Sequence, residues 1–335
     1  MTDWHQFLLA QGAVIGEDAV VHFDETPADY EQLLAVDTLC DLADLGVLAV
    51  TGAKSADFLH GQTTADFVKS PPTGPIRGAC CNPQGRVFTL FTALRTDAGY
   101  LLIMPRALVA PSREALARYA ALSRVELADA SAAYRILGLA GPAADRLASE
   151  LEEPNGGGSI DGTRALCHAA QRYLLLVPTA VAEACWAALA QCARPVGLPL
   201  WHLADIRAGI AALSPETREQ FVPQMLGLEQ RGAVSFTKGC YTGQEVVARS
   251  QHLGKLKRHL YRLGFAAPAV PKPGVPLAIP QGGQPAGTLV AAAPAAAGYC
   301  EALAVLRDEA GQCTALEFGD GTRAVTFLPL PSAAA

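Results

Sequence analysis

The sequence contains little charge. Of its 335 residues, 17% are Asp, Glu, Lys or Arg, whereas 50% are hydrophobic. A chain with this balance can bury a large core, which argues against intrinsic disorder. The formal net charge is -6, so the chain lacks the overall basic character of proteins that bind nucleic acid through counterion release. At this length we expect two or three domains.

The sequence also lacks recognisable membrane-directing segments. Residues 1–5 do not lead from a charged region into an apolar one, so no signal peptide is predicted. The most apolar stretch, Tyr173 to Cys192, is interrupted by Pro178 and by polar residues. A membrane span needs ~20 apolar residues, so we interpret the stretch as a strand over Tyr173–Val177 and a helix over roughly Val181–Cys192. We therefore expect a cytoplasmic protein.

The cysteines show no metal-binding pattern. The nine cysteines include no CxxC pair and no Cys/His cluster at zinc spacing, so reduced thiols are expected. Four of them lie among apolar neighbours and are predicted to be buried: Cys40, Cys167, Cys185 and Cys192. The vicinal pair Cys80-Cys81 is interpreted as two buried thiols, with a redox-active pair as the alternative. Phosphate-binding loops, nucleophile elbows and HExxH helices are absent from the sequence.

Most of the chain mixes helix and strand patterns. Strands are predicted at Gly46–Val50, Arg86–Leu94 and Tyr100–Met104, and helices at Lys54–Leu59, Arg113–Leu122 and Pro142–Leu151. This mixture indicates an α+β architecture. The run Asn155–Ser159 is expected to be a flexible loop inside a domain.

The last fifth of the chain has a different pattern. A stretch rich in Pro and Gly, Ala266 to Gly283, predicts a boundary. Four short apolar runs separated by turns follow it: Gly287–Ala292, Tyr299–Leu306, Thr314–Phe318 and Arg323–Leu328. Short strands at such spacing are typical of a small all-β module.

The segment from Phe236 to Arg249 carries the clearest chemical pattern. Thr242 and Glu245 have the spacing of a capping box, which predicts a helix that begins there. Gly254 would end this helix.

Cys240 would then lie directly before a helix N-terminus. The macrodipole there and the nearby cation of Lys238 both favour the thiolate form of the cysteine. Gly239 and Gly243 let the backbone turn and let a ligand approach closely. The residues alone therefore predict a reactive thiol at Cys240. The alternative is a cysteine that serves only packing.

The same segment resembles a known family. Lys238-Gly239-Cys240-Tyr241-Thr242-Gly243-Gln244-Glu245 matches in full the signature of the YgfZ-type folate-binding proteins, which are relatives of the aminomethyltransferases of glycine cleavage. Five further segments match in order: residues 50–52, 58–66, 82–86, 221–224 and 232–236. The resemblance covers roughly residues 30 to 265 well and the β module loosely.

The resemblance implies an α+β fold of three domains, an aminomethyltransferase-like ring around a central folate-binding hole. Residues 1–50 and 196–255 would form a discontinuous folate-binding domain. Residues 51–195 would form a ferredoxin-like insertion, and residues 256–335 a small β-barrel.

The resemblance also implies a function. The protein would bind tetrahydrofolate or a related folate and support the assembly or repair of iron–sulfur clusters, and thereby the iron–sulfur enzymes that modify tRNA. Its partners would be iron–sulfur proteins or the cluster-assembly machinery, with no direct nucleic-acid or membrane partner, and the chain would be a monomer. Cys240 would be the residue on which this activity depends, assisted by Lys238.

Candidate folate contacts follow from the same resemblance: Leu45, Trp201, Asp205, Arg207, Gly239, Tyr241, Gln244 and Glu245. The indole of Trp201 would stack on a flat ring of folate. Arg207 stands where relatives have a glutamate, and it would instead reach the glutamyl carboxylate of folate. Leu45 stands where relatives have a second tryptophan and cannot stack comparably. We therefore expect weaker or differently posed folate binding.

One departure argues against transferase chemistry. Aminomethyltransferases carry an acidic catalytic residue in the strand that matches Gly85–Phe91, and no carboxylate lies in this stretch. We expect no classical aminomethyltransferase activity. A folate-dependent aminomethyl or one-carbon transferase remains the alternative, and a scaffold with a vestigial folate cavity is a third interpretation.

Two further features have two interpretations each. His60 would either line the ligand cavity or fill a structural role. Five basic residues would either guide a polyglutamyl folate or an acidic partner, or form an ordinary solvated face: Arg249, Lys255, Lys257, Arg258 and Arg262.

Overall fold

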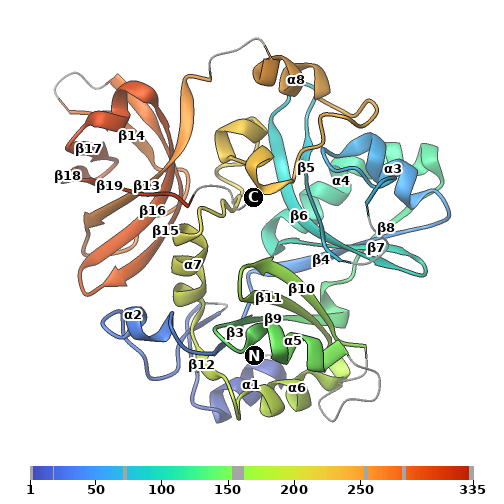
Figure 1. Cartoon of the computed structure of the whole chain (residues 1–335), viewed down its shortest axis with the longest axis horizontal. Coiled ribbons are helices and arrows are strands. Elements are labelled where there is room, and N and C mark those ends of the chain that lie inside the picture. Colours follow the sequence, from blue (N-terminus) through green and yellow to red (C-terminus); the bar gives the residue numbers. More distant parts are fainter. Residues whose placement is uncertain are drawn as a thin grey trace.

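The computed structural model describes residues 3–17, 19–70, 74–152, 162–252, 256–280 and 284–331. Within these residues the strands form three large sheets and one two-stranded sheet. The three large sheets surround the centre of the molecule (Figure 1). One apolar cluster contains residues of all three sheets, among them Val47, Leu174 and Val290. The predicted α+β ring is therefore confirmed.

The first sheet has the strand order β5-β6-β7-β4-β8. Its strands are β4 (Leu45–Thr51), β5 (Ile76–Cys81), β6 (Val87–Thr96), β7 (Gly99–Pro105) and β8 (Glu126–Asp129). Two helices, α3 (Ser55–Gln62) and α4 (Arg106–Ser123), bury apolar residues against it, including Phe58, Val109 and Leu116. The strands and helices predicted in this part of the sequence are confirmed, because their apolar periodicity reports the face that is buried.

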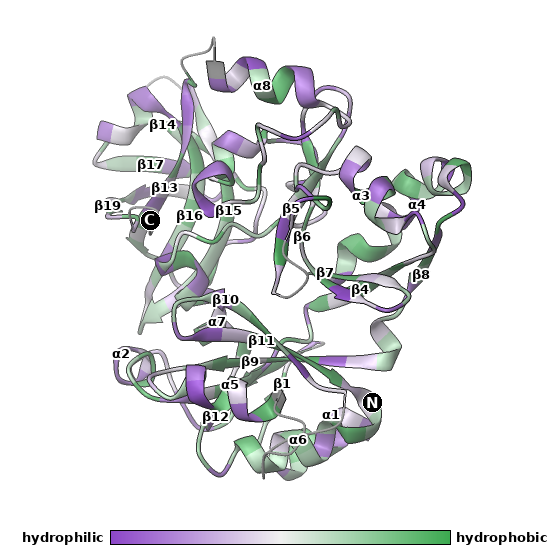
Figure 2. Cartoon of the chain, turned by 45° about the vertical axis from the view of Figure 1, so that its right-hand side comes forward, coloured by the Kyte–Doolittle hydropathy of each residue, from purple (hydrophilic) through white to green (hydrophobic). Residues whose placement is uncertain are grey.

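The second sheet has the order β10-β11-β9-β3-β12. Its strands are β3 (Thr38–Asp41), β9 (Tyr134–Ala140), β10 (Arg164–Ala169), β11 (Arg172–Pro178) and β12 (Arg194–Val196). The helices α1 (Asp3–Ala10), α5 (Ala144–Glu152) and α6 (Ala182–Leu189) share one apolar cluster with it. Figure 2 shows apolar residues along β9 and β11.

The apolar stretch Tyr173 to Cys192 is thus a strand followed by a helix, as predicted. Among the described residues, no helix is long and apolar enough to cross a membrane.

The third sheet has seven strands in the order β18-β17-β14-β15-β16-β13-β19. They are β13 (Arg258–Ala266), β14 (Pro276–Ile279), β15 (Gln284–Ala296), β16 (Tyr299–Arg307), β17 (Ala315–Phe318), β18 (Gly321–Ala324) and β19 (Thr326–Leu328). A single residue separates β18 from β19, yet they lie at opposite edges of the sheet. The two edges must therefore meet, which makes the sheet a small barrel.

The structure corrects one strand of this module. The run Arg323–Leu328 was expected to be one strand, but it is divided at Val325. The amide of Val325 donates to the carbonyl of Thr314 at 2.9 Å, and the segments on either side pair with β17 and β13. The Pro- and Gly-rich stretch from Ala266 to Gly283 also contains a strand of the barrel, β14, so it is not only a boundary.

The remaining elements connect these sheets. A two-stranded sheet of β1 (Val14–Ile15) and β2 (Val20–His22) precedes α2 (Tyr30–Leu33). Helix α7 (Leu198–Arg207) packs against β15 and β16 of the barrel as well as against β2 and β3. Helix α8 (Gln244–His252) follows the signature segment.

Strand pairing groups the chain differently from the expected domain boundaries. Residues 51–195 contribute β5 to β8 to the first sheet and β9 to β11 to the second sheet. Strand β4, most of which lies in the expected first domain, pairs with β7 and β8. The expected domain boundaries therefore do not coincide with the sheets. The division into three domains stays a prediction: residues 1–50 with 196–255, residues 51–195, and residues 256–335.

The described cysteines are all free thiols. Cys40 and Cys185 are buried as predicted, whereas Cys167 and Cys192 are exposed. Cys167 follows the buried Leu166 on the edge strand β10, and successive side chains of a strand point to opposite faces. Cys80 and Cys81 are buried free thiols, and burial raises the pKa of Cys81 to about 12. The expected loop at Asn155–Ser159 and the expected helix end at Gly254 lie outside the described residues.

A buried carboxyl group leads to a pH-dependent prediction. Asp41 is 2% exposed and accepts a hydrogen bond from the Trp4 indole at 3.2 Å. Burial raises the pKa of Asp41 to about 6, although the Trp4 hydrogen bond and the charge of Arg135 lower it. The folded state therefore binds this proton more tightly than the unfolded state, and stability is lost as pH rises from about 4 through about 6.

We expect the Asp41→Asn variant to be more stable than the parent chain by about 1–3 kcal/mol at pH 7, because it removes an ionised carboxylate from the core. The advantage should shrink at pH 4, where the parent carboxyl is neutral in the folded state and its pKa no longer separates the two states strongly. Denaturant unfolding at the two pH values measures this. The exposed Asp97→Asn is the control, and an advantage that does not depend on pH would contradict the prediction.

Candidate functional site

The signature segment forms a loop between a short 3₁₀ helix (Glu229–Arg231) and α8. The loop lies beside the C-terminal end of α3 and beside the turn between β5 and β6. Motifs that are far apart in the sequence meet here through hydrogen bonds and backbone contacts. The sequence singled out these motifs separately, and the structure brings them together.

Lys238 anchors the loop to α3. Its ammonium group donates hydrogen bonds to the carbonyl oxygens of Thr63 at 2.8 Å, of Ala65 at 2.7 Å and of His60. The residue is 8% exposed, and burial lowers its pKa to about 8 although the charges of Asp66 and Cys80 favour the ammonium form. An ammonium group has three donors, and three backbone carbonyls accept them.

Tyr241 is the second inward anchor. It is 7% exposed, and the Lys238 ammonium lies 5.0 Å from the centroid of its ring. The neighbouring Thr242 hydroxyl donates to the amide oxygen of Gln62 at 3.2 Å. Residues on both sides of Cys240 are therefore attached to α3 or to the residues that follow it.

Gly243 permits the closest approach in the loop. It has a φ of +84°, and a Cβ atom at this position would lie 2.5 Å from the carbonyl oxygen of Asn82. The Asn82 side chain in turn accepts hydrogen bonds from the amides of Gln84 and Arg86, both at 3.0 Å, and so shapes the turn that meets Gly243. Any side chain at residue 243 would push this turn away from the loop.

Two further motifs hold the segments that flank the loop. The Thr64 hydroxyl donates to the carbonyl of Ala233 at 2.6 Å, and the amide of Ser235 donates to the carbonyl of Thr64 at 2.9 Å. The Gln224 side chain donates to the carbonyl of Val247 in α8 at 2.7 Å. Four of the five matched segments thus form one scaffold around residues 238–245.

Cys240 is exposed on this scaffold. It lies four residues before Gln244, the first residue of α8, rather than directly before the helix. The predicted capping box is not formed by its side chains, because Thr242 bonds to Gln62 and Glu245 pairs with Arg249 at 2.9 Å. The scaffold therefore presents the thiol by fixing both sides of it, and not through a capped helix start.

His60 lies close to the same loop. Its Nε2 would be 3.6 Å from a Cβ atom built on Gly239, and its Nδ1 is 3.3 Å from the carboxylate of Asp66. Burial and the charge of Lys238 lower the pKa of His60, against the effect of Asp66. His60 thus packs beside the signature loop. This position is consistent with a structural role, which was one of the two interpretations of this residue.

The other predicted folate contacts lie on α7 and β4. In both views α8 lies at the top of the molecule and α7 lies well below it (Figures 1 and 2). Trp201 is 6% exposed. The Arg172 guanidinium lies 4.0 Å from its ring centroid and the His168 ring stacks on it at 5.6 Å. Only a glycine fits at residue 138, since a Cβ there would lie 2.6 Å from the indole.

Asp205 belongs to the same cluster. It bonds to Nε2 of His168 and to the guanidinium of Arg172, each at 2.8 Å. Burial disfavours the charge, but Arg172 and His168 outweigh it and hold the pKa of Asp205 well below its usual range. The carboxylate is thus ionised and partnered.

Arg207 is engaged on the barrel side of α7. Its guanidinium donates to Glu301 at 2.8 Å and also bonds to Glu31. Glu301 is 4% exposed and accepts from Arg262 at 2.6 Å as well. Arg262 is therefore part of a buried ion-pair network, so the predicted basic run is not one solvated face. Of that run, Arg249 pairs with Glu245, and Lys255 lies outside the described residues.

The predicted site residues thus fall into separate groups. Gly239, Tyr241, Gln244 and Glu245 share the signature scaffold with Cys240 and Lys238, whereas Trp201, Asp205 and Arg207 share α7. Leu45 is a partly buried residue of β4 that packs on the apolar cluster between the sheets. Glu245 is exposed and paired within its own helix.

The α7 residues predicted to contact folate are engaged with other residues of the protein. Trp201 is covered by Arg172, His168 and the backbone at Gly138, which leaves little of the indole for a pterin. Arg207 already holds two carboxylates of the protein. Both side chains are thus held by partners within the protein, and their roles in folate binding stay a prediction.

Three residues of these clusters were missed from the sequence: His168, Arg172 and Glu301. Each of the three lies in a strand. The pattern of a strand predicts whether a side chain is exposed or buried, but not which side chain it contacts. Their partners are 33 to 94 residues away in the chain, so no local spacing indicated them.

Comparison with known proteins defines the class first. The aminomethyltransferase T of the glycine cleavage system from Bartonella henselae matches with a TM-score of 0.80, over 98% of this chain and 96% of that chain, at 15% identity. Residues 5–156 match the family model of the GCVT N-terminal domain. The chain therefore has the aminomethyltransferase fold.

Two curated relatives then define the family. The tRNA-modifying protein YgfZ from Enterobacter sp. (strain 638) is 30% identical over 303 residues, which cover 88% of this chain and 93% of that protein. The tRNA-modifying protein YgfZ from Yersinia enterocolitica is 31% identical over 304 residues, which cover 88% and 92%. The chain belongs to the YgfZ family.

Proposed function

We propose that this protein is a cytoplasmic accessory factor that binds tetrahydrofolate or a related folate and supports the assembly or repair of iron–sulfur clusters. Through these clusters it would support the enzymes that modify tRNA. Membership of the YgfZ family supports this proposal, as does the name of the two relatives as tRNA-modifying proteins.

One observation carries the proposal. Four separate segments of the chain form a scaffold around residues 238–245, and this scaffold leaves the Cys240 thiol exposed between two buried anchors, Lys238 and Tyr241. A cysteine that served only packing would be expected inside the core. Cys240 would act on an iron–sulfur cluster, on a persulfide or on a thiol of a partner protein, since all three need an accessible sulfur atom.

Lys238 has a different part in this proposal from the one that its position in the sequence suggested. The sequence suggested a cation that favours the thiolate of Cys240, whereas the three donors of Lys238 are occupied by backbone carbonyls and hold the loop in place. Folate binding is supported by the fold and the family. We leave its contacts unassigned on α7, because Trp201 and Arg207 are engaged with other residues.

The Cys240→Ser variant is expected to abolish rescue of a bacterial strain that lacks its own protein of this family. The substitution removes the sulfur atom but keeps the size of an exposed side chain, so the melting temperature should stay the same. Growth rescue and thermal unfolding of the purified variant measure the two outcomes. Cys167→Ser, at another exposed cysteine, should rescue fully.

Two results would separate the parts of the proposal. Full rescue by Cys240→Ser would remove the thiol mechanism. Calorimetric titration of both proteins with tetrahydrofolate should show equal binding; no heat in either would remove the folate part and favour a scaffold with a vestigial cavity. Formation of a one-carbon product from an aminomethyl donor would favour the alternative, a transferase.

A further inference from the structure

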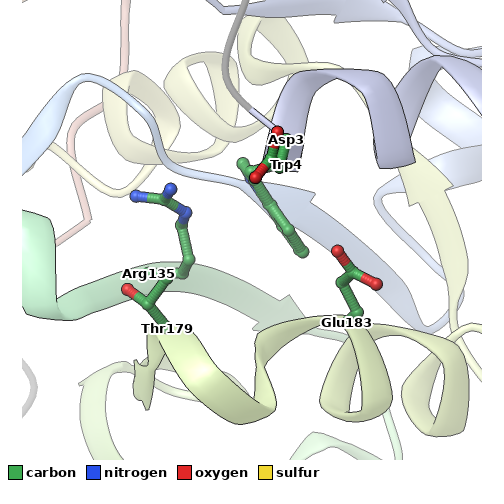
Figure 3. A pocket seen from close by; sticks show the side chains of 5 residues that line it. All are labelled: Asp3, Trp4, Arg135, Thr179 and Glu183. Atoms are coloured by element: carbon green, nitrogen blue, oxygen red, sulfur yellow. The ribbon is translucent and has the colours of Figure 1, made fainter.

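A pocket of about 470 Å³ lies in the second sheet's layer of helices, away from the signature loop. Its lining comes from four elements: Asp3 and Trp4 of α1, Arg135 of β9, Thr179 of a 3₁₀ turn (Thr179–Val181) and Glu183 of α6. Figure 3 shows these side chains around one space. Helices α1 and α6 lie at the opposite end of the molecule from α8 (Figure 1).

The hydrogen bonding of Arg135 is the first observation that indicates a ligand in this pocket. Its Nε is buried and has no hydrogen-bond partner. Among the residues that the structure describes, no carboxylate lies within ion-pair distance of its guanidinium. A buried donor without an acceptor costs about 1–3 kcal/mol, and most such groups in proteins are satisfied. The guanidinium would be satisfied by an anionic group in the pocket.

The other side of the pocket has the opposite charge. Figure 3 shows the carboxylate of Glu183 across the Trp4 ring from Arg135, and Asp3 next to Trp4. The described part of the chain places no cation against Glu183. The lining thus offers one positive and two negative groups, and among these described residues no ion pair joins Arg135 to Glu183 or Asp3.

Trp4 forms a rigid wall between these charges. Its indole nitrogen donates to Asp41 at 3.2 Å, its ring stacks on Phe7 at 5.4 Å, and it meets Trp186 edge-on at 5.9 Å. The Thr179 hydroxyl is held as well, because it donates to the carbonyl of Ala132 at 3.0 Å. A pocket with fixed walls loses little entropy when it binds a ligand.

We propose that this pocket binds a small zwitterion of the α-amino-acid type. The planar fork of Arg135 would bind its carboxylate through two hydrogen bonds. Glu183 and Asp3 would bind its ammonium groups, and Trp4 would pack against the carbon chain between them. Because the pocket carries a net charge of one negative unit, it favours an amino acid with one carboxylate and two ammonium groups. The site is independent of the function proposed for Cys240.

The probe is L-lysine, titrated into the full-length protein by calorimetry. Two matched compounds test the need for both charges: cadaverine lacks the carboxylate, and hexanoate lacks both ammonium groups. We expect L-lysine to bind and each of the other two to bind at least about ten-fold more weakly, because each leaves one charged side of the pocket unpaired. No binding of L-lysine, or equal binding of cadaverine, would overturn the proposal.

Variants place the binding in this pocket. Arg135→Met keeps the apolar stem and Glu183→Gln keeps the shape, and each is expected to weaken L-lysine binding by about ten- to a hundred-fold. The exposed pair Arg113→Met and Glu114→Gln on α4 should leave it unchanged. If Arg135→Met unfolds, Glu183→Gln decides the matter, since residue 183 is exposed on its helix. Unchanged binding in Glu183→Gln would refute the proposed site.

Discussion

The Lys238→Met variant is expected to be less stable than the parent chain by about 3 kcal/mol or more, although methionine fills nearly the same volume. The Lys238 ammonium is the donor for three backbone carbonyls at the end of α3. Methionine offers none of these donors, and each buried carbonyl left without a partner costs about 1–3 kcal/mol. Denaturant unfolding of the variant and of the parent chain measures the loss in free energy of unfolding.

The matched control is Lys54→Met. Lys54 stands at the other end of the same helix, where its side chain is exposed, so its replacement should cost little. The functional readout is expected to follow stability: Lys238→Met should fail to rescue at high temperature and recover in part at low temperature. A variant of normal stability that never rescues would show instead that Lys238 acts in the chemistry itself.

This prediction separates Lys238 from Cys240, which the sequence placed together as a reactive pair. The two residues are neighbours in the signature, but Lys238 is 8% exposed while Cys240 is exposed at the surface. Loss of the cysteine should therefore affect function without affecting stability, and loss of the lysine should affect both. One segment thus contains a working residue and the anchor that positions it.

The Glu301→Gln variant has the second large expected effect. Glu301 is 4% exposed on β16 and accepts hydrogen bonds from Arg207 of α7 and Arg262 of β13. Glutamine keeps one acceptor but removes the negative charge, which leaves two guanidinium groups close together in a buried site. Breaking a buried ion pair by removing one partner typically costs about 3–5 kcal/mol. We expect about 3 kcal/mol here, because the amide oxygen retains part of the bonding.

Glu31→Gln provides the control for this network. Glu31 also bonds to Arg207, but its side chain is 70% exposed, and exposed ion pairs contribute about 0–1 kcal/mol. Thermal unfolding of the two variants compares them directly. If Glu301→Gln were as stable as Glu31→Gln, the network would not hold α7 against the barrel. Arg207 would then be free to meet a ligand carboxylate, as the sequence suggested.

Several features of the fold could be read from the sequence because they depend on neighbouring residues. Apolar periodicity predicted a strand at Gly46–Val50 and a helix at Arg113–Leu122, and both lie within observed elements, β4 and α4. This periodicity reports burial wherever the element packs. Where strand pairing depends on residues far away in the chain, one prediction from local pattern was wrong. The run Arg323–Leu328 looks like one strand, yet pairing with two different neighbours divides it at Val325.

The candidate site shows the same division. The signature indicated the position of Cys240, because a long specific segment identifies its family without knowledge of the fold. It did not indicate that Thr242 would bond to Gln62, 180 residues away, in place of the capping box that its spacing suggested. Side-chain partners are selected by what lies nearest in space, and a capping box is only one of the options open to a threonine.

The amino-acid sequence by itself determined the family of this protein, the α+β nature of its elements and the segment that carries the exposed thiol. These depend on residue order and on local periodicity. The tertiary structure alone decided that Lys238 anchors a helix end, that Asp205 and Arg207 are engaged by His168, Arg172 and Glu301, and that the buried Nε of Arg135 lies beside a pocket without a hydrogen-bond partner. Each of these depends on which charges and carbonyls meet when segments far apart in the chain pack together, and spacing along the chain does not contain that information.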